Sequence, residues 1–173
     1  MKSLISTELE VNYARHLNPL SGLPGNVLIE HRLSRFLTAS APYTILYVDI
    51  NDFKVYNDVY GFENGDRMLQ HLASILSGCV SECSCGSFLG HIGGDDFIII
   101  LESYDVSWLC NKIIEAFDSS IKNFYTNNDL ERGFITSKNR RGEEEKFSMA
   151  GISIAGITNK CNNFKNIYEL SEY

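Results

Sequence analysis

The 173-residue chain has no apolar run as long as the roughly 18 residues that a membrane-spanning helix needs. Its first residues, MKSLISTELEV, lack the apolar segment of a secretory signal peptide, so we expect a cytoplasmic location, alone or as part of a longer protein. Basic residues are few, since 15 Lys and Arg stand against 22 Asp and Glu, a formal net charge of −7. This balance argues against a broad nucleic-acid surface, although a local basic pocket can still hold a nucleotide.

The chain has five cysteines, an odd number, so they cannot all be paired with one another. Cys79, Cys83 and Cys85 lie close together in sequence, and His91 follows, but a structural zinc site needs a second pair of ligands at a fixed spacing. We therefore expect reduced thiols rather than a metal centre. With 44% hydrophobic and 21% charged residues, the chain has the composition of a single globular domain with a sizeable core.

Strand-like and helix-like segments alternate along the chain. The hydrophobic spacing predicts helices over 27–37, 51–60, 66–76 and 105–124, and strands over 44–50, 87–92, 97–101 and 147–157. Residues 1–16 are expected to begin a lead-in helix, 61–65 to form a turn, and the charged run 139–146 to form a solvated hairpin tip. This order favours an α/β (α+β) domain with a mixed or mainly antiparallel sheet.

The stretch HIGGDDFIII places two acids at the start of a strand that is apolar enough to be buried on both faces. Gly93 and Gly94 are typical of a hairpin turn, because glycine tolerates a positive φ. Asp95 and Asp96 then follow the turn, while Asp49 ends the earlier strand over 44–50. Taken alone, Asp95 is better interpreted as a turn residue and Asp96 as a solvated strand end.

The three acids gain a second interpretation if their strands are neighbours in one sheet. Carboxylates that converge at one sheet edge stay ionised only beside cations, and Mg²⁺ suits such oxygen ligands, with Mn²⁺ as a substitute. Mg²⁺ ions held in this way orient a nucleophilic hydroxyl and neutralise a phosphoryl transfer. The pattern therefore indicates a nucleotide-handling domain of the nucleotide-cyclase and polymerase palm type.

Four motifs in order resemble the GGDEF family, the diguanylate cyclases. The stretch DINDFKVYNDVYGFENGD (49–66) is similar to the family pattern D-x-D-x-F-K-x-x-N-D-x-x-G-x-x-x-G-D. LSGLPGN (20–26) resembles the family's early loop, GGDDF (93–97) its signature, and ISIAG (152–156) its late strand. The resemblance covers most of the chain and implies a GGDEF-like domain over 17–173, a mainly antiparallel sheet wrapped by helices, and a last helix that is cut short.

The resemblance also implies a role for each matching residue. Metal binding would fall to Asp49, the Ile50 carbonyl, Asp95 and Asp96; catalysis to Asp95, Asp96 and Lys54; and GTP binding to Asn57, Asp66, Asn51, Asp52, Phe53, Gly93 and Gly94. Asn57 and Asp66 would read the guanine, since an amide donates and accepts and a carboxylate accepts from the base. Backbone amides at the start of the helix after Asp49 would cradle the phosphates. Each residue has a plainer alternative: Asn57 capping a turn, Asp66 capping the next helix, and Phe53 in the core.

Departures from the family pattern separate two functions. Asp96 replaces the usual glutamate, and misplacing a catalytic group by about 1 Å can cost on the order of a hundredfold in rate. Positions 84–87 read SCGS, so the family's R-x-x-D product-inhibition site is expected to be absent. The early loop ends in Gly25-Asn26 rather than Asn-Arg, and the phosphate-contacting helix expected after residue 173 is missing.

The first function is a diguanylate cyclase that condenses two GTP into cyclic di-GMP and two pyrophosphates across a homodimer. The second is a weak or inactive GTP-binding regulatory domain of a larger signalling protein, for example one that also contains a phosphodiesterase domain. The Asp96 replacement favours this second function. A different palm-type cyclase would explain the GGDD turn but not Asn57 and Asp66. A purely structural domain gives no reason to gather acids at one sheet edge.

Overall fold

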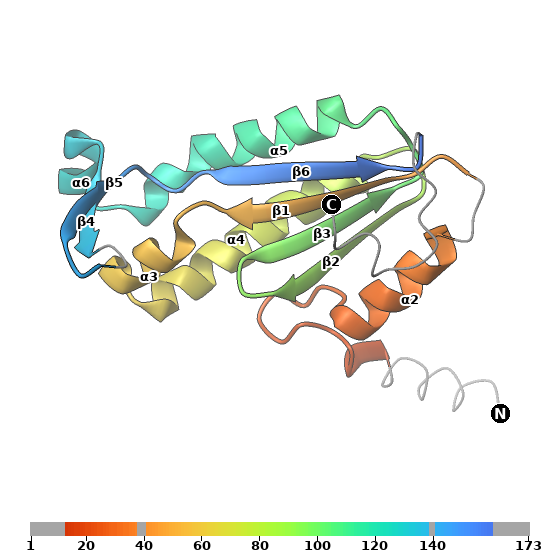
Figure 1. Ribbon diagram of the computed structural model, residues 1–173, viewed down its shortest axis with the longest axis horizontal. Coiled ribbons are helices and arrows are strands. Elements are labelled where there is room, and N and C mark those ends of the chain that lie inside the picture. The colour runs from red at the N-terminus through yellow and green to blue at the C-terminus, as the bar shows by residue number, and fades with distance from the viewer. Residues whose placement is uncertain (1–12, 38–40, 139–140, 161–173) are drawn as a thin grey trace.

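The computed structural model describes residues 13–37, 41–138 and 141–160. Its centre is a four-stranded sheet in the order β2-β3-β1-β6, and every neighbouring pair of strands is antiparallel (Figure 1). The strands are β1 (Thr44–Ile50), β2 (Ser87–Gly93), β3 (Asp96–Leu101) and β6 (Ile152–Thr158). The prediction of a mainly antiparallel sheet wrapped by helices is confirmed.

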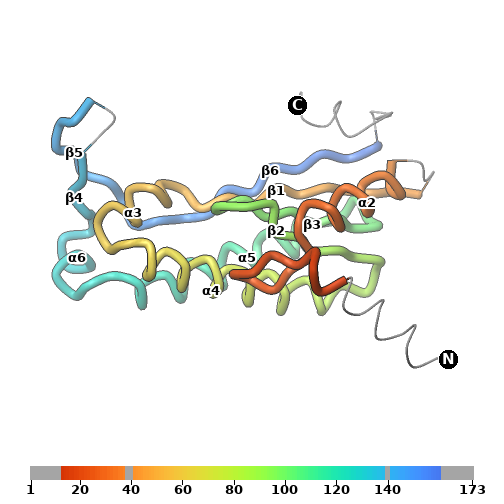
Figure 2. Tube along the Cα trace, turned by 90° about the horizontal axis from the view of Figure 1, so that it is seen from below, coloured from red at the N-terminus to blue at the C-terminus, as the bar shows by residue number. Residues whose placement is uncertain are grey.

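Helices cover both faces of this sheet. The helices α4 (Phe62–Ser81) and α5 (Ser107–Ser120) lie together on one side of it (Figure 2), and α2 (Asn26–Leu37) packs on the other. The alternation along β1 explains this arrangement, since Leu46 and Val48 join the core cluster of α4 and α5 while Ile45 joins that of α2.

Strand β3 is the most buried part of the sheet. Phe97, Ile98, Ile99 and Ile100 have no exposed surface, because the strand has a neighbour on each side and helices on both faces. Burying one isoleucine side chain contributes about 1.5–3 kcal/mol relative to leaving it exposed. The run therefore fixes the position of the turn that precedes it.

The smaller elements gather beyond the carboxyl end of β1, at the left of Figure 1. They are α3 (Phe53–Tyr60), a 3-10 turn (Ile121–Phe124), α6 (Asn127–Arg132), and the hairpin of β4 (Ile135–Lys138) and β5 (Glu144–Phe147). Strand β4 packs against α3, so the hairpin stands beside the segment that follows β1. Among the described residues, no helix is both long and apolar enough to cross a membrane.

Most predicted elements are confirmed, and the described residues 141–146 of the charged run are exposed. The predicted strand over 147–157 is wrong as a single strand, because β5 ends at Phe147 and β6 begins at Ile152 in the other sheet. The predicted turn over 61–65 is wrong, because α4 already begins at Phe62 and includes Gly65. The predicted helix over 105–124 is shorter, because α5 ends at Ser120 and a 3-10 turn follows it, and Trp108 and Ile114 of α5 are exposed. The predicted lead-in helix lies largely outside the described residues, as does the segment after residue 160.

Candidate functional site

A pocket of about 460 Å³ opens at the carboxyl end of β1. It is lined by Asp49, Ile50, Asp52, Phe53, Lys54, Val55, Asp58, Asp95, Lys138, Glu145 and Phe147. The first seven of these come from β1, α3 and the connection between them, Asp95 comes from the β2–β3 turn, and the last three come from the β4–β5 hairpin. Six of the predicted site residues therefore lie around one cavity: Asp49, Ile50, Asp52, Phe53, Lys54 and Asp95.

Asp49 and Asp95 are brought together by the pairing of β1 with β3, in which Val48 lies opposite Phe97. The pKa of Asp49 is raised from 3.8 to about 6, first because the carboxyl is partly buried, then by the charge of Asp95 and a hydrogen bond with it, and then by Asp96. The pair therefore holds negative charge poorly without a cation.

The donor set of this pair fits Mg²⁺, which is usually held by one or two carboxylates together with substrate phosphates. Asp49, Asp95 and the neighbouring Ile50 could supply the protein ligands. Within residues 13–37, 41–138 and 141–160, no group of three or more His, Cys, Asp or Glu side chains is arranged to hold a metal ion. A bound nucleotide would thus have to complete the coordination.

The chain turns sharply from β1 into α3 at Asp52, whose φ is 57°. This left-handed conformation is uncommon outside glycine, though aspartate tolerates it better than most residues. It sets the first turn of α3 beside the pocket, and the first amides of a helix have no intrahelical acceptor. They are available for an anion, with Lys54 alongside.

Asn51 makes two hydrogen bonds to the segment of β6, and its predicted contact with GTP stays a prediction. Its backbone N–H donates to the Gly151 carbonyl at 2.9 Å, and its Oδ1 accepts from the Ser153 hydroxyl at 2.6 Å. Asn51 therefore ties the end of β1 to the segment of β6 and does not line the pocket. Phe53 is buried in the core, as predicted, and its edge reaches the pocket.

The two residues predicted to read guanine lie next to the pocket lining rather than in it. The side chain of Asn57 lies against Gly65 in α4, so close that a Cβ on Gly65 would be 1.8 Å from Asn57 Oδ1. Asp66, the next residue of α4, is exposed. It lies within the helix, so the alternative that it caps the helix is wrong, since Gly61 holds that position.

Asn57 Oδ1 is buried and has no hydrogen-bond partner among the described residues. An unpaired buried carbonyl oxygen costs roughly 1–3 kcal/mol. Asn57 is one of the residues predicted to read guanine. A bound base could supply the missing hydrogen-bond donor to Asn57 Oδ1 after a small movement of this side chain. The glycine at position 65 therefore serves close packing inside α4 rather than the predicted turn.

Replacing Gly65 with alanine should push the Asn57 amide out of place. The new Cβ would also lie 3.1 Å from the Phe53 ring, which limits relaxation, so we expect a loss of about 1–2 kcal/mol in the free energy of unfolding, together with weaker guanine nucleotide binding. Gly78→Ala is the matched control, because it lies in the same helix and its Cβ would meet nothing within 4 Å. Urea denaturation and nucleotide titration measure the two effects. Equal stabilities and equal nucleotide affinities of the two variants would contradict this role of Gly65.

The glycines of the β2–β3 turn shape the site from outside it. Gly93 has a φ of 150° and Gly94 a φ of 58°, so the turn needs residues without a Cβ, as predicted. Asp96 begins β3 and is exposed, and it does not line the pocket. Although the residue is exposed, its carboxyl is partly desolvated beside Asp95, and this desolvation followed by the charge of Asp95 raises its pKa. The structure thus separates Asp95, which faces the cavity, from Asp96, which lies at its margin.

His91 links this turn to the early loop. The ring is buried, stacks on Phe97 with centroids 4.2 Å apart, and donates from Nε2 to the Gly94 carbonyl at 3.0 Å. Its Nδ1 lies 2.8 Å from the hydroxyl of Ser21, and its backbone N–H donates to the Pro24 carbonyl at 2.9 Å. The early-loop motif therefore supports the position of the GGDD turn, which the sequence did not reveal.

The comparisons agree with this geometry. The family model for the diguanylate cyclase GGDEF domain matches residues 15–138. The signalling protein YkoW of Bacillus subtilis strain 168 is 32% identical over 131 residues, 70% of this chain and 16% of YkoW. A diguanylate cyclase of Vibrio cholerae is 37% identical over 65 residues, 38% of this chain and 19% of the relative. The chain thus spans less than a fifth of either protein.

Solved structures share the fold. The coiled coil and GGDEF domain of DgcB from Caulobacter crescentus, in complex with c-di-GMP, matches with a TM-score of 0.68 and 16% identity over 99% of this chain and 82% of that one. The S helix-GGDEF-EAL part of Vibrio cholerae LapD, bound to c-di-GMP, gives 0.69 and 18% over 98% of this chain and 35% of that one. With its family match over most of the length, the chain belongs to the GGDEF-domain family.

Proposed function

We propose that this domain binds GTP with Mg²⁺ and condenses two GTP molecules into cyclic di-GMP and two pyrophosphates. The observation that carries the proposal is the pair of Asp49 and Asp95 at the mouth of a pocket that also holds the start of α3 and Lys54. Diguanylate cyclases among the relatives support it. Since each domain would hold one GTP, two domains would have to face each other as a homodimer.

The residues divide the work by position. The first amides of α3 and the Lys54 ammonium would hold the phosphates, and Asn57 with Asp66 would select guanine. Asp95, close to the phosphate site, would accept a hydrogen bond from the attacking 3′-hydroxyl of the second GTP and help to remove its proton. Mg²⁺, when bound by Asp49 and Asp95, would neutralise the charge that develops on the reacting phosphate.

A second function is favoured by one specific observation, the exposed Asp96 outside the pocket lining. The shorter side chain at this position would leave nucleotide binding intact while lowering turnover. The domain would then act as a GTP-binding regulatory part of a larger signalling protein. Relatives such as the bifunctional diguanylate cyclase/cyclic di-GMP phosphodiesterase MucR of Pseudomonas aeruginosa combine two activities in one chain, and this chain spans 16% of MucR.

Replacing Asp95 with alanine tests both functions, with exposed Asp118 of α5 replaced in the same way as the control. Each protein is incubated with GTP and Mg²⁺, and cyclic di-GMP and pyrophosphate are measured, with nucleotide binding followed by calorimetry. We expect wild type and Asp118→Ala to make product and Asp95→Ala to make at least a hundredfold less, consistent with removal of a positioned catalytic group (roughly 10²–10⁴-fold).

The other outcomes distinguish the two functions. Binding of GTP that requires Mg²⁺, without any product, would support the regulatory role and contradict the cyclase. Neither binding nor product from the wild-type protein would contradict both.

A further inference from the structure

The β4–β5 hairpin forms a wall of the pocket that the sequence did not predict. Lys138 ends β4, while Glu145 and Phe147 lie on β5, and all three line the cavity together with Asp49 and Asp95. The side chain of Lys138 is exposed, and none of the hydrogen bonds or ion pairs recorded for the described residues involves it. Among the described residues, the Lys138 ammonium therefore has no partner that it helps to hold in place.

The charges around the pocket show why this lysine matters. Five carboxylates line the cavity, those of Asp49, Asp52, Asp58, Asp95 and Glu145. Lys54 and Lys138 are the two cationic side chains among the lining residues described. Asp49 and Asp95 have a use as ligands of Mg²⁺, but the remaining acids would repel a triphosphate. Its terminal phosphates need cations from the protein, and Lys54 supplies one from α3.

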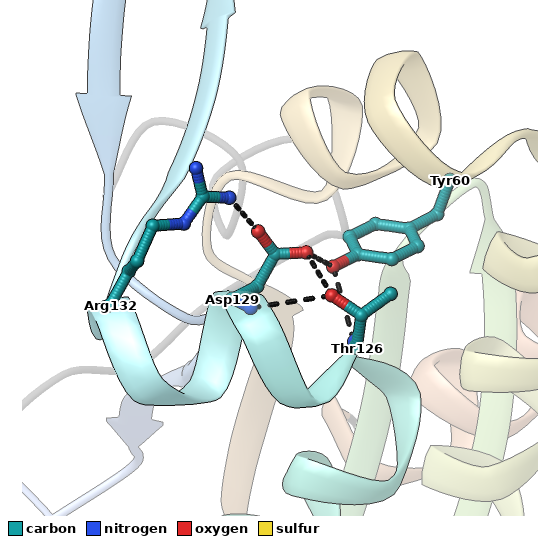
Figure 3. Close-up of polar contacts among 4 residues, drawn as sticks. All are labelled: Tyr60, Thr126, Asp129 and Arg132. Atoms are coloured by element: carbon teal, nitrogen blue, oxygen red, sulfur yellow. Dashed lines mark hydrogen bonds and ion pairs between the residues drawn. The ribbon is translucent and has the colours of Figure 1, made fainter.

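The hairpin is fixed at its base, which gives Lys138 a defined position. Figure 3 shows Asp129 of α6 at the centre of a polar cluster, accepting from Tyr60, Arg132 and Thr126. The Thr126 hydroxyl lies 2.6 Å from the Asp129 carboxylate, and these partners, Thr126 foremost, lower the pKa of Asp129 to about 2. Tyr60 belongs to α3, so the cluster joins the helix that lines the pocket to the helix that leads into β4.

The other end of the hairpin is held in a similar way. The Ala150 N–H, which follows β5, donates to the hydroxyl of buried Tyr125 at 2.8 Å. Tyr125 packs edge-on against Tyr56 and Tyr60 of α3, with ring centroids 5.4 and 5.5 Å away. Both strands of the hairpin are thus tied to α3, which fixes the backbone that carries Lys138 relative to the pocket.

We infer that Lys138 binds the terminal phosphates of GTP from the hairpin wall, while Lys54 binds them from α3. The inference rests on the proposed nucleotide site and adds a second cationic contact to it. Lys138 would bind and orient GTP rather than take part in the chemical step, because the phosphates that it contacts leave as pyrophosphate. It also explains why the hairpin is anchored to α3 so thoroughly.

The test compares Lys138→Ala with Lys146→Ala in the full chain. Lys146 lies on the same hairpin, but its ammonium sits 4.4 Å from the centre of the Phe134 ring and does not line the pocket. Affinities for GTP and for GMP, each with Mg²⁺, are measured by competition with a fluorescent GTP analogue. Loss of one charge-assisted contact should weaken GTP binding about tenfold in Lys138→Ala. GMP binding should stay unchanged, as should both affinities in Lys146→Ala.

Each alternative outcome has a distinct meaning. GTP affinity of Lys138→Ala equal to that of wild type would overturn the inference and leave the proposed function intact. An equal loss of GTP and GMP affinity would overturn the assignment to the terminal phosphates. Wild-type protein that fails to bind GTP with Mg²⁺ would overturn the proposed function and this inference together. Lys138→Glu, expected to weaken GTP binding further, and thermal melts of all variants separate a lost contact from a damaged fold.

Discussion

Asp49→Asn is expected to stabilise the metal-free domain and to abolish its response to Mg²⁺. At neutral pH, Asp49 is a partly buried carboxylate beside Asp95, and its pKa is raised to about 6. The negative charge of Asp49 therefore destabilises the folded state. Because solvent screens the partly exposed pair, we expect a gain in unfolding free energy on the order of 1 kcal/mol in the variant, less than the full shift would give.

The sign of the pH dependence follows from the direction of the shift. The carboxyl has a higher pKa in the folded chain, about 6, than its usual 3.8, so the folded state binds the proton more tightly. The destabilisation by Asp49 is therefore complete above pH 6 and disappears as the pH falls toward 3.8. The advantage of Asp49→Asn should shrink over the same window, and Mg²⁺ affinity of the wild type should fall as the pH drops through about 6.

Urea denaturation at pH 7.5 and pH 4.5, with EDTA or with Mg²⁺ and GTP, measures these effects together. Ligands that bind only the folded state raise its stability, so Mg²⁺ with GTP should shift the wild-type midpoint upward and leave that of Asp49→Asn unchanged. Asp58→Asn is the matched control, since Asp58 lines the same pocket but is not among the groups that raise the pKa of Asp49. A variant that still responds to Mg²⁺ as the wild type does would remove Asp49 from the metal site.

The second large effect is expected from Asp96→Glu, which should raise cyclase turnover by about ten- to a hundredfold, since errors of about 1 Å in catalytic geometry can cost that much. Asp96 is exposed at the start of β3, outside the pocket lining that Asp95 reaches. One added methylene lets the carboxylate extend toward the cavity without moving the strand, because the buried residues from Phe97 onward fix the backbone.

Steady-state production of cyclic di-GMP by Asp96→Glu, wild type and Asp96→Asn tests this expectation. The asparagine variant keeps the size of aspartate and removes its charge, so it should be slower than wild type if the charge takes part. Equal GTP affinities in all three proteins would place the effect on turnover. If Asp96→Glu gains nothing while the wild type is active, the aspartate is already well placed and the departure from the family pattern has no catalytic cost.

Much of the fold follows from local patterns in the sequence. The apolar strands over 44–50 and 97–101, the glycines at 93 and 94, and the helical spacing in α2 all appear where local patterns place them. These features depend on backbone preferences and on burial over a few neighbouring residues. Gly65 misled the prediction, because the sequence shows that a glycine is present but not that the Asn57 side chain occupies the place of its Cβ.

The motifs in the sequence therefore determined the family, the strands that carry the acids, and six of the residues that line the pocket. Only the tertiary structure decided which of them share a cavity. The pairing of β1 with β3 brings Asp95 to Asp49, and Asn51 is hydrogen-bonded to the β6 segment and does not line the pocket. The anchored hairpin brings Lys138 to the pocket, although it lies 89 residues after Asp49 in the chain. Such contacts depend on strand register and long-range packing, and the local pattern of residues determines neither of them.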